Sequence, residues 1–221
     1  MGAGRAVLIA GCFAVVGVQV VNAQEPARAA RSGRRALLPR AEEIVLARSA
    51  APASVSDSAT VYVLADTGFV VAVRGSNGAA CFVDRSWSLA LEPHCFDAEG
   101  AATIMLMHMR HLELVQRGVS YEDAERQLAT ELSSGRFRLP RRPAMSYMMS
   151  AEQLLYDDEG KRVGNWQPHL MIYYPFLRNA DIGASAPDIS AAAVDNEGQP
   201  DASMVIVVKK FVQPVRSGSS R

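Results

Sequence analysis

Two kinds of periodicity alternate along the chain and predict a domain that mixes strands with helices. β-branched residues fill positions 60–65 and 69–74, on either side of Asp66-Thr67-Gly68, a pattern typical of a β-hairpin. A turn at residues 75–78 leads into another apolar run at 79–84. We therefore expect three strands that follow one another as a meander.

The sequence predicts three helices: one at residues 41–49, from Glu42 and Glu43 in its first turn, and two at 97–117 and 120–134, from apolar residues at helical spacing. Asp97 and Ser120 precede the second and third of these, where an N-cap residue is expected. These segments are long enough to cover a sheet, so the helices belong to the core of the domain.

The C-terminal half adds shorter elements and ends in an apolar strand. The sequence predicts, in chain order, a short strand or irregular buried segment over 145–149, a helix start at 150, a strand over 169–174, a long loop over 177–203 and a last strand over 204–208. The predicted fold is α+β: an antiparallel sheet of about five strands with helices packed on one face.

The composition limits the function classes. The chain has 221 residues, of which 49% are hydrophobic, enough for one domain with its own core, expected over residues 41–214. Its formal net charge of zero disfavours a general nucleic-acid partner. Residues 24–40 are rich in Ala and Arg without apolar periodicity and predict a flexible basic linker, while residues 215–221 predict a disordered tail.

The N-terminus has the pattern of a targeting segment. Arg5 precedes an apolar stretch at 6–21, and Val21-Asn22-Ala23 suits cleavage by a signal peptidase, so we expect a signal peptide over residues 1–23 and export to the periplasm or medium. We expect no stable membrane span after cleavage. Cys12 follows Ile9-Ala10-Gly11, which leaves open a lipoprotein lipidated at that cysteine.

Cleavage after Ala23 leaves two cysteines, Cys81 and Cys95. Two cysteines in an exported chain predict a disulfide bond, and two free buried thiols are the alternative. The chain lacks a CxxC pair, which argues against thiol–disulfide exchange as its chemistry.

A metal site is one hypothesis. His108 and His111 are three residues apart on a predicted helix, and His169 or His94 could add a third ligand for zinc. Methionines along the same helix and near residues 145–149 also leave copper open. Core packing explains the same residues, and we expect no cofactor, with zinc or copper kept as the alternative.

A second candidate site surrounds His169. Trp166 precedes this histidine in the sequence, and a nearby polar segment contains Ser146, Tyr147 and Ser150. These residues could line a small ligand pocket. One of the two serines could also act as a nucleophile with His169 as its base, although neither serine stands in a G-x-S-x-G or S-x-x-K motif.

The segment Ala144-Met-Ser-Tyr-Met-Met-Ser150, with Val163-Gly164, Trp166 and Pro168-His-Leu-Met171, resembles a segment of exported bacterial proteins of unknown function. The resemblance is clearest over residues 142–176. It implies a bacterial, exported protein, and it carries no activity, cofactor or catalytic residue to this chain.

These observations favour a non-catalytic exported protein that binds a small ligand or a partner near Trp166 and His169. The alternative is an envelope hydrolase or metalloenzyme that uses His169 with His108 and His111. A third class, a structural component of the envelope, would use the basic linker and the long loop as contact surfaces.

Overall fold

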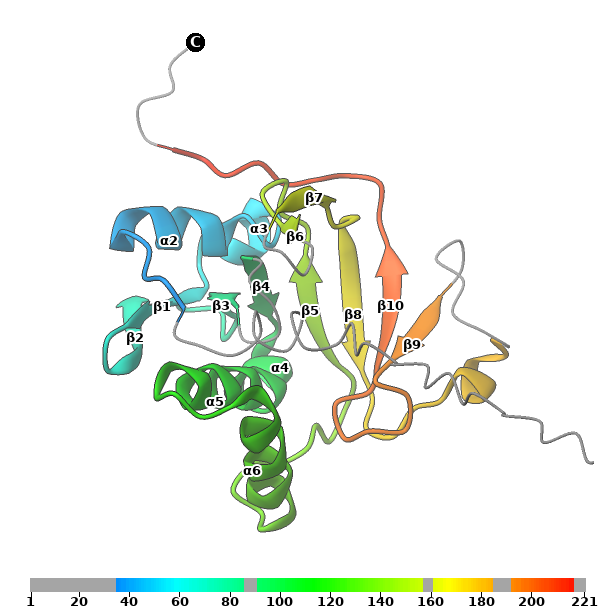
Figure 1. Cartoon of the computed structure of the whole chain (residues 1–221). Coiled ribbons are helices and arrows are strands. Elements are labelled where there is room, and N and C mark those ends of the chain that lie inside the picture. Colours follow the sequence, from blue (N-terminus) through cyan, green and yellow to red (C-terminus); the bar gives the residue numbers. More distant parts are fainter. Residues whose placement is uncertain (1–34, 86–90, 157–160, 185–191, 217–221) are drawn as a thin grey trace, which may run out of the picture.

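The computed structural model describes residues 35–85, 91–156, 161–184 and 192–216, and its centre is an eight-stranded sheet (Figure 1). The strands lie in the order β2-β1-β3-β4-β5-β8-β10-β9. Their bounds are Thr60–Ala65 (β1), Gly68–Val73 (β2), Ala80–Asp84 (β3), Glu92–Phe96 (β4), Ala144–Met148 (β5), His169–Tyr173 (β8), Ala193–Asp195 (β9) and Ser203–Val207 (β10). Neighbouring strands of this sheet are antiparallel except β1 and β3, which are parallel.

The α+β class is confirmed, but the sheet is larger than predicted and mixed. The predicted meander is wrong at its third strand, because β3 pairs with β1 and not with β2. After β2 the chain crosses the start of β1 at Gly75, where a Cβ atom would lie 2.2 Å from the backbone nitrogen of Thr60. Only glycine permits this close crossing, which delivers β3 to the far side of β1.

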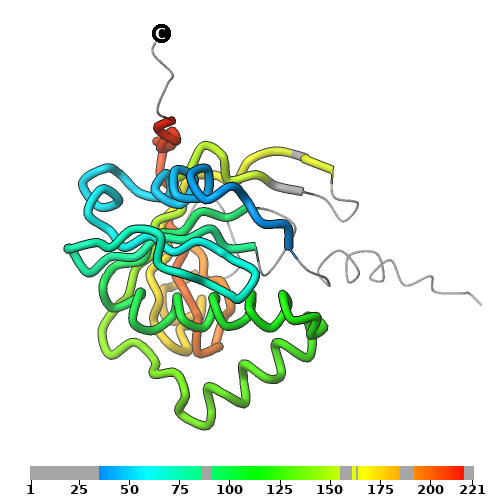
Figure 2. The backbone as a smooth tube through the Cα atoms, turned by 90° about the vertical axis from the view of Figure 1, so that its left-hand side faces the viewer, coloured from blue at the N-terminus to red at the C-terminus, as the bar shows by residue number. Residues whose placement is uncertain are grey.

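Helices cover both faces of the sheet, whereas the sequence predicted one covered face. The helices are α2 (Arg40–Arg48), α3 (Ala53–Ser56), α4 (Ala98–Ala101), α5 (Ile104–Gln116), α6 (Tyr121–Ser133) and the short 3-10 helix η1 (Asn179–Ile182). In Figure 2, α2 (blue) lies on one side of the cyan strands β1–β3, and α5 and α6 (green) lie on the other.

The predicted helix over 97–117 is divided in two. Asp97 caps α4 by accepting a hydrogen bond of 2.7 Å from the Gly100 amide, as the sequence suggested. The chain then leaves helical geometry at Thr103 before α5 begins. Ser120 caps α6 in the predicted way, accepting from the Asp123 amide at 3.1 Å.

Two buried clusters lie on opposite faces of the sheet. Leu46 of α2 packs with Val61, Val83 and the cysteines on one face. On the other face Phe82 and Phe96 pack against methionines of α5, with Leu128 of α6 behind them. Alternation along β3 and β4 therefore sends every second side chain toward α5.

The disulfide between Cys81 and Cys95 is confirmed, and it joins directly opposed residues of β3 and β4. The two Cα atoms are 4.0 Å apart. Cys95 thus lies in a strand that the sequence did not indicate, because Pro93 lies inside it. Among the described residues, no helix is both long and apolar enough to cross a membrane.

The predicted helix start at Ser150 is wrong. The Ser150 hydroxyl accepts a hydrogen bond from the Glu152 amide at 3.1 Å, as a helix cap would, but the chain then becomes extended. A separate two-stranded sheet follows, formed by β6 (Leu154–Tyr156) and β7 (Arg162–Asn165). The long loop predicted over 177–203 contains η1 and β9.

Residues 35–40 of the predicted linker contact the folded domain. The Nε of Arg35 donates to the carbonyl of Arg85 at 2.7 Å, and the side chain of Gln116 bonds to the Arg35 backbone. Arg85 in turn pairs with Glu43 of α2. The predicted signal peptide, Cys12 and residues 24–34 lie outside the described residues, as do residues 217–221 of the predicted tail.

Candidate functional site

A polar cluster lies inside the domain, on the face of the sheet that α5 covers. Strand pairing fixes its members: Phe82 opposes His94, Phe96 opposes Ser146, and Ala144 opposes Tyr173. Because side chains alternate along a strand, Asp84, His94, Ser146 and Tyr173 project from the same face. His108 reaches this face from α5.

Phe96 is the common neighbour of the three rings in this cluster. Its centroid lies 5.6 Å from that of His94 and 5.9 Å from those of His108 and Tyr173. The two imidazole rings are 5.6 Å apart. The cluster is therefore continuous, with aromatic packing holding its polar atoms in place.

Asp84 and His108 form a buried hydrogen bond of 2.8 Å between Oδ2 and Nδ1. Burial alone lowers the pKa of His108, but the hydrogen bond and charge of Asp84 outweigh it, and the pKa is raised above its usual 6.5. A fixed imidazole next to a buried carboxylate can hold a positive charge or exchange a proton.

His94 is only 2% exposed, and neither ring nitrogen has a hydrogen-bond partner among the described residues. Burial, reinforced by the charge of His108, lowers its pKa to about 3. His94 is therefore neutral at physiological pH. A buried polar group without partners destabilises the fold by roughly 1–3 kcal/mol, so its presence needs a reason beyond packing.

Ser146 and Tyr173 complete the cluster on the side of β5 and β8. The Tyr173 hydroxyl lies 3.4 Å from the Ser146 hydroxyl and donates to the Met171 sulfur at 3.5 Å. Burial raises the pKa of Tyr173 above its usual value, so this phenol stays protonated.

A half-open groove of about 460 Å³ lies next to this cluster. One wall comes from α5, α6 and the loop after α6, and the other from the loops after β8 and before β10. In Figure 1, α6 and these two loops lie at the lower end of the sheet. The lining residues are Met107, Glu125, Leu128, Ala129, Leu132, Ser133, Phe137, Leu139, Phe176, Gln199, Pro200 and Asp201. Most of this surface is apolar.

Phe176 occupies an unusual position in the groove wall. Its φ angle is +65°, a left-handed conformation that a bulky side chain adopts at a cost of about 1–3 kcal/mol. A hydrogen bond of 2.8 Å from its amide to the Gln199 carbonyl holds the turn, and 55% of the residue is exposed. The backbone conformation that places the aromatic ring of Phe176 at the groove is therefore unfavourable in itself, and the surrounding fold stabilises it.

Asp201 connects the groove with the polar cluster. It lines the groove, and its charge acts on both His108 and Tyr173. Burial raises the pKa of Asp201, and the nearby positive charge of His108 partly offsets that effect. The Nδ2 of Asn196 donates to its carboxylate at 2.8 Å.

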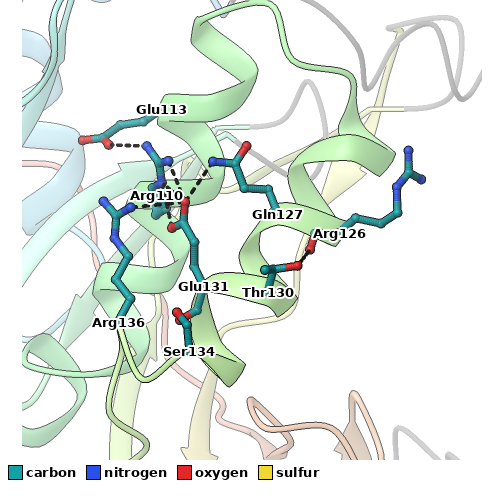
Figure 3. A network of polar contacts seen from close by, with 8 residues as sticks. All are labelled: Arg110, Glu113, Arg126, Gln127, Thr130, Glu131, Ser134 and Arg136. Carbon is teal, nitrogen blue, oxygen red and sulfur yellow. Dashed lines mark hydrogen bonds and ion pairs between the residues drawn. The ribbon is translucent and has the colours of Figure 1, made fainter.

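The position of α6, which forms one groove wall, depends on a network of polar contacts (Figure 3). Arg110 of α5 donates from Nε and from a terminal nitrogen to the carboxylate of Glu131 at 2.7–3.2 Å. Gln127 and Arg136 bind the same carboxylate. A forked arginine–carboxylate pair fixes direction as well as distance, so it sets the angle between the helices.

The structure separates the ligand-site residues predicted around His169. Trp166 lies 6.3 Å from His169, measured between ring centroids, and Ser146 projects from the same sheet face as His169. Tyr147 points to the opposite face, where it packs with the cluster around Leu46. Ser150 is buried against the hydroxyl of Ser49 at 2.6 Å.

The three histidines predicted as metal ligands do not share one set of partners. His108 bonds to Asp84, whereas Nε2 of His111 lies 3.1 Å from Glu125, with Tyr121 beside its ring. Nδ1 of His169 donates to the Gln167 carbonyl at 2.7 Å, and burial lowers the pKa of this histidine. In the described ranges, no group of three His, Cys, Asp or Glu side chains has the geometry to hold a metal ion.

Sequence reasoning missed Asp84, Asp201 and Phe176, and it named His94 only as a spare metal ligand. One signal was available for His94. The predicted disulfide sets Cys95 opposite Cys81, which puts His94 beside Phe82 on the other face of the strands. Nothing in the local sequence indicates that loops near residues 176 and 201 meet α6.

Comparison with known proteins adds no family to this description. No protein-family model matches the chain, and neither a curated protein nor a solved structure shows significant similarity to it.

Proposed function

We propose that this chain is an exported protein whose folded domain binds a small, largely apolar ligand in the groove between α6 and the loops around Phe176 and Asp201. The observation that carries the proposal is Phe176, which a strained backbone presents to the groove opposite Leu128 and Leu132 of α6. A volume of about 460 Å³ is within the usual range for small-molecule sites.

Export is supported by two observations. The first 23 residues have the pattern of a signal peptide, and the disulfide between Cys81 and Cys95 suits an oxidising compartment such as the periplasm or the medium. A ligand would therefore meet the protein outside the cytoplasm.

A binding experiment tests the groove directly. The neutral fluorescent probe N-phenyl-1-naphthylamine should bind the mature protein, residues 24–221, with one site per chain. Ala129 lines the groove from an exposed position on α6, so Ala129→Trp should fill the groove without disturbing the core and weaken binding about tenfold or more.

Thr130→Trp is the matched control, because Thr130 is the next residue on α6, also exposed and outside the groove lining. It should leave the dissociation constant within about twofold of the wild-type value. Equal losses in both variants, or no saturable binding to the wild-type protein, would refute the proposed function.

An enzyme is the second candidate, and the buried pair Asp84–His108 is the observation that favours it. This pair resembles the base and orienting carboxylate of many acid–base sites. The alternative based on His169 with His108 and His111 has less support, because each of these rings has different partners. Hydrolysis of p-nitrophenyl butyrate that disappears in His108→Gln would favour the enzyme; equal background rates would favour binding.

A further inference from the structure

We propose that the ligand of this groove is an organic cation: an amine or quaternary ammonium group attached to an apolar body. The inference rests on the proposed function and adds the chemical class of the ligand. It is carried by the charges that surround the groove, by the pairing of the nearby arginines, and by the aromatic side chain at its mouth.

The ionisable residues of the groove lining are all acidic. Of the described lining residues, only Glu125 and Asp201 can carry a charge, and the remaining polar ones are Ser133 and Gln199. Two carboxylates in a mostly apolar groove give it a negative potential, and the low polarity of the walls strengthens that potential. An anionic ligand would be repelled, whereas a cationic ligand would add an opposite charge to the partners that the two carboxylates already have.

The arginines close to α6 contact carboxylates outside the groove lining. Arg110 and Arg136 both pair with Glu131, as Figure 3 shows. Arg138 donates to Glu99 at 2.9 Å, and Arg142 lies 3.5 Å from the same carboxylate. These ion pairs direct the four guanidinium groups toward Glu131 and Glu99 and not toward Glu125 or Asp201.

His108 compensates Asp201 only in part. The same imidazole is hydrogen-bonded to Asp84 at 2.8 Å, so one positive charge is shared between two carboxylates. Asp84 and Asp201 therefore compete for the positive charge of His108. Glu125, which lines the groove from α6, is a second carboxylate and lies 3.1 Å from His111.

Aromatic rings favour a cation at the same place. Phe176 and Phe137 both line the groove, and the faces of such rings attract positive charge. Phe137 already shows this behaviour, since the guanidinium carbon of Arg136 lies 5.6 Å from its ring centroid. Phe176, more than half exposed, offers a second ring to a bound ammonium group.

The test compares three probes with the same apolar chain and different head groups: octylamine, 1-octanol and octanoate, titrated into the mature protein by calorimetry at pH 7.5. Octylamine should bind about tenfold more tightly than 1-octanol, with octanoate the weakest, and this preference should shrink at high salt. Asp201→Asn and Glu125→Gln should each reduce the preference, while Asp57→Asn, an exposed carboxylate outside the groove, should leave it unchanged.

The outcomes separate this inference from the proposed function. Equal binding of all three probes, blocked by Ala129→Trp, would keep the groove as a binding site and overturn the choice of a cation. Tighter binding of octanoate would also overturn it. Failure of every probe to bind, or a dimer in sedimentation that Ala129→Trp dissociates, would overturn both proposals. If Glu125→Gln and a folded Asp201→Asn both kept the wild-type preference for octylamine, the two carboxylates would not recognise the cation, and the inference would be overturned.

Discussion

Nδ1 of His108 lies 2.8 Å from Oδ2 of Asp84, and neither side chain has more than marginal contact with solvent. The next ring, His94, lies 5.6 Å from His108 and has its pKa displaced in the opposite direction. Two adjacent histidines thus respond to pH in different windows, one above and one below the ordinary imidazole pKa. The contribution of each histidine to stability can therefore be measured separately, in its own pH range.

Asp84→Asn should remove a pH-dependent contribution to stability. The pKa of His108 is raised above 6.5 in the folded state, so its stabilising effect is complete below pH 6.5 and is lost as pH rises through the folded pKa. We expect the variant to lose about 3 kcal/mol of unfolding free energy at pH 6 and less at pH 9, measured by urea denaturation. Asp195→Asn, an exposed carboxylate on β9, is the control. Equal losses for Asp84→Asn at both pH values would contradict the assignment.

His94→Leu should act in the acidic window. The pKa of His94 in the folded protein is about 3. Between pH 6.5 and pH 3 its imidazole is therefore protonated in the unfolded chain but neutral in the folded protein, so the free energy of unfolding falls as the pH falls. Leucine removes this loss. Relative to wild type, the variant should gain about 2 kcal/mol between pH 7.5 and pH 5. Denaturation curves at the two pH values measure the gain, and a constant difference between the proteins would mean that His94 becomes protonated in the fold.

Glu131→Gln should loosen α6. Its carboxylate receives the forked hydrogen bonds of Arg110, and both side chains are nearly buried, at 12% and 10% exposed. We expect a loss of about 2 kcal/mol in unfolding free energy, because a charged guanidinium loses its main partner. Glu152→Gln breaks the solvent-exposed pair with Arg216 and should lose less than about 1 kcal/mol. Similar losses in the two variants would argue against a special role for Arg110.

Elemental analysis of the mature protein, purified without a histidine tag, tests the metal hypothesis. We expect no stoichiometric zinc or copper, because His108, His111 and His169 have different partners in the structure. A stoichiometric metal that disappears in His169→Ala would contradict this expectation. It would also move the proposed function toward the metalloenzyme that the sequence left open.

Much of the fold follows from local patterns. β-branched runs indicated the strands at 60–65 and 69–74, and Ser120 fixed the start of α6. Other features depend on contacts that no local pattern records. The strand β4 was not predicted because it contains Pro93, and proline usually interrupts a strand. The crossing of the chain at Gly75 depends on contact with the backbone of Thr60, which no local sequence pattern records.

The candidate site was harder to predict because its parts are distant in sequence. His169 and Ser146 lie on neighbouring strands of one sheet, but the groove forms where α6 meets loops at residues 176 and 199–201. A left-handed backbone is normally predicted from a glycine or an asparagine, so the positive φ angle of Phe176 could not be predicted from the sequence. Non-local sites of this kind become visible only in the assembled fold.

Methyl NMR of the methionines can show whether a ligand occupies the groove. Met107 lines the groove, whereas Met105 on the same helix is buried in the core and Met145 lies on β5 outside the groove lining. On titration with octylamine into protein carrying labelled methionine methyl groups, we expect a saturable shift of the Met107 signal, with the Met145 signal unchanged. Saturable binding that shifts other methionines and leaves Met107 in place would contradict it.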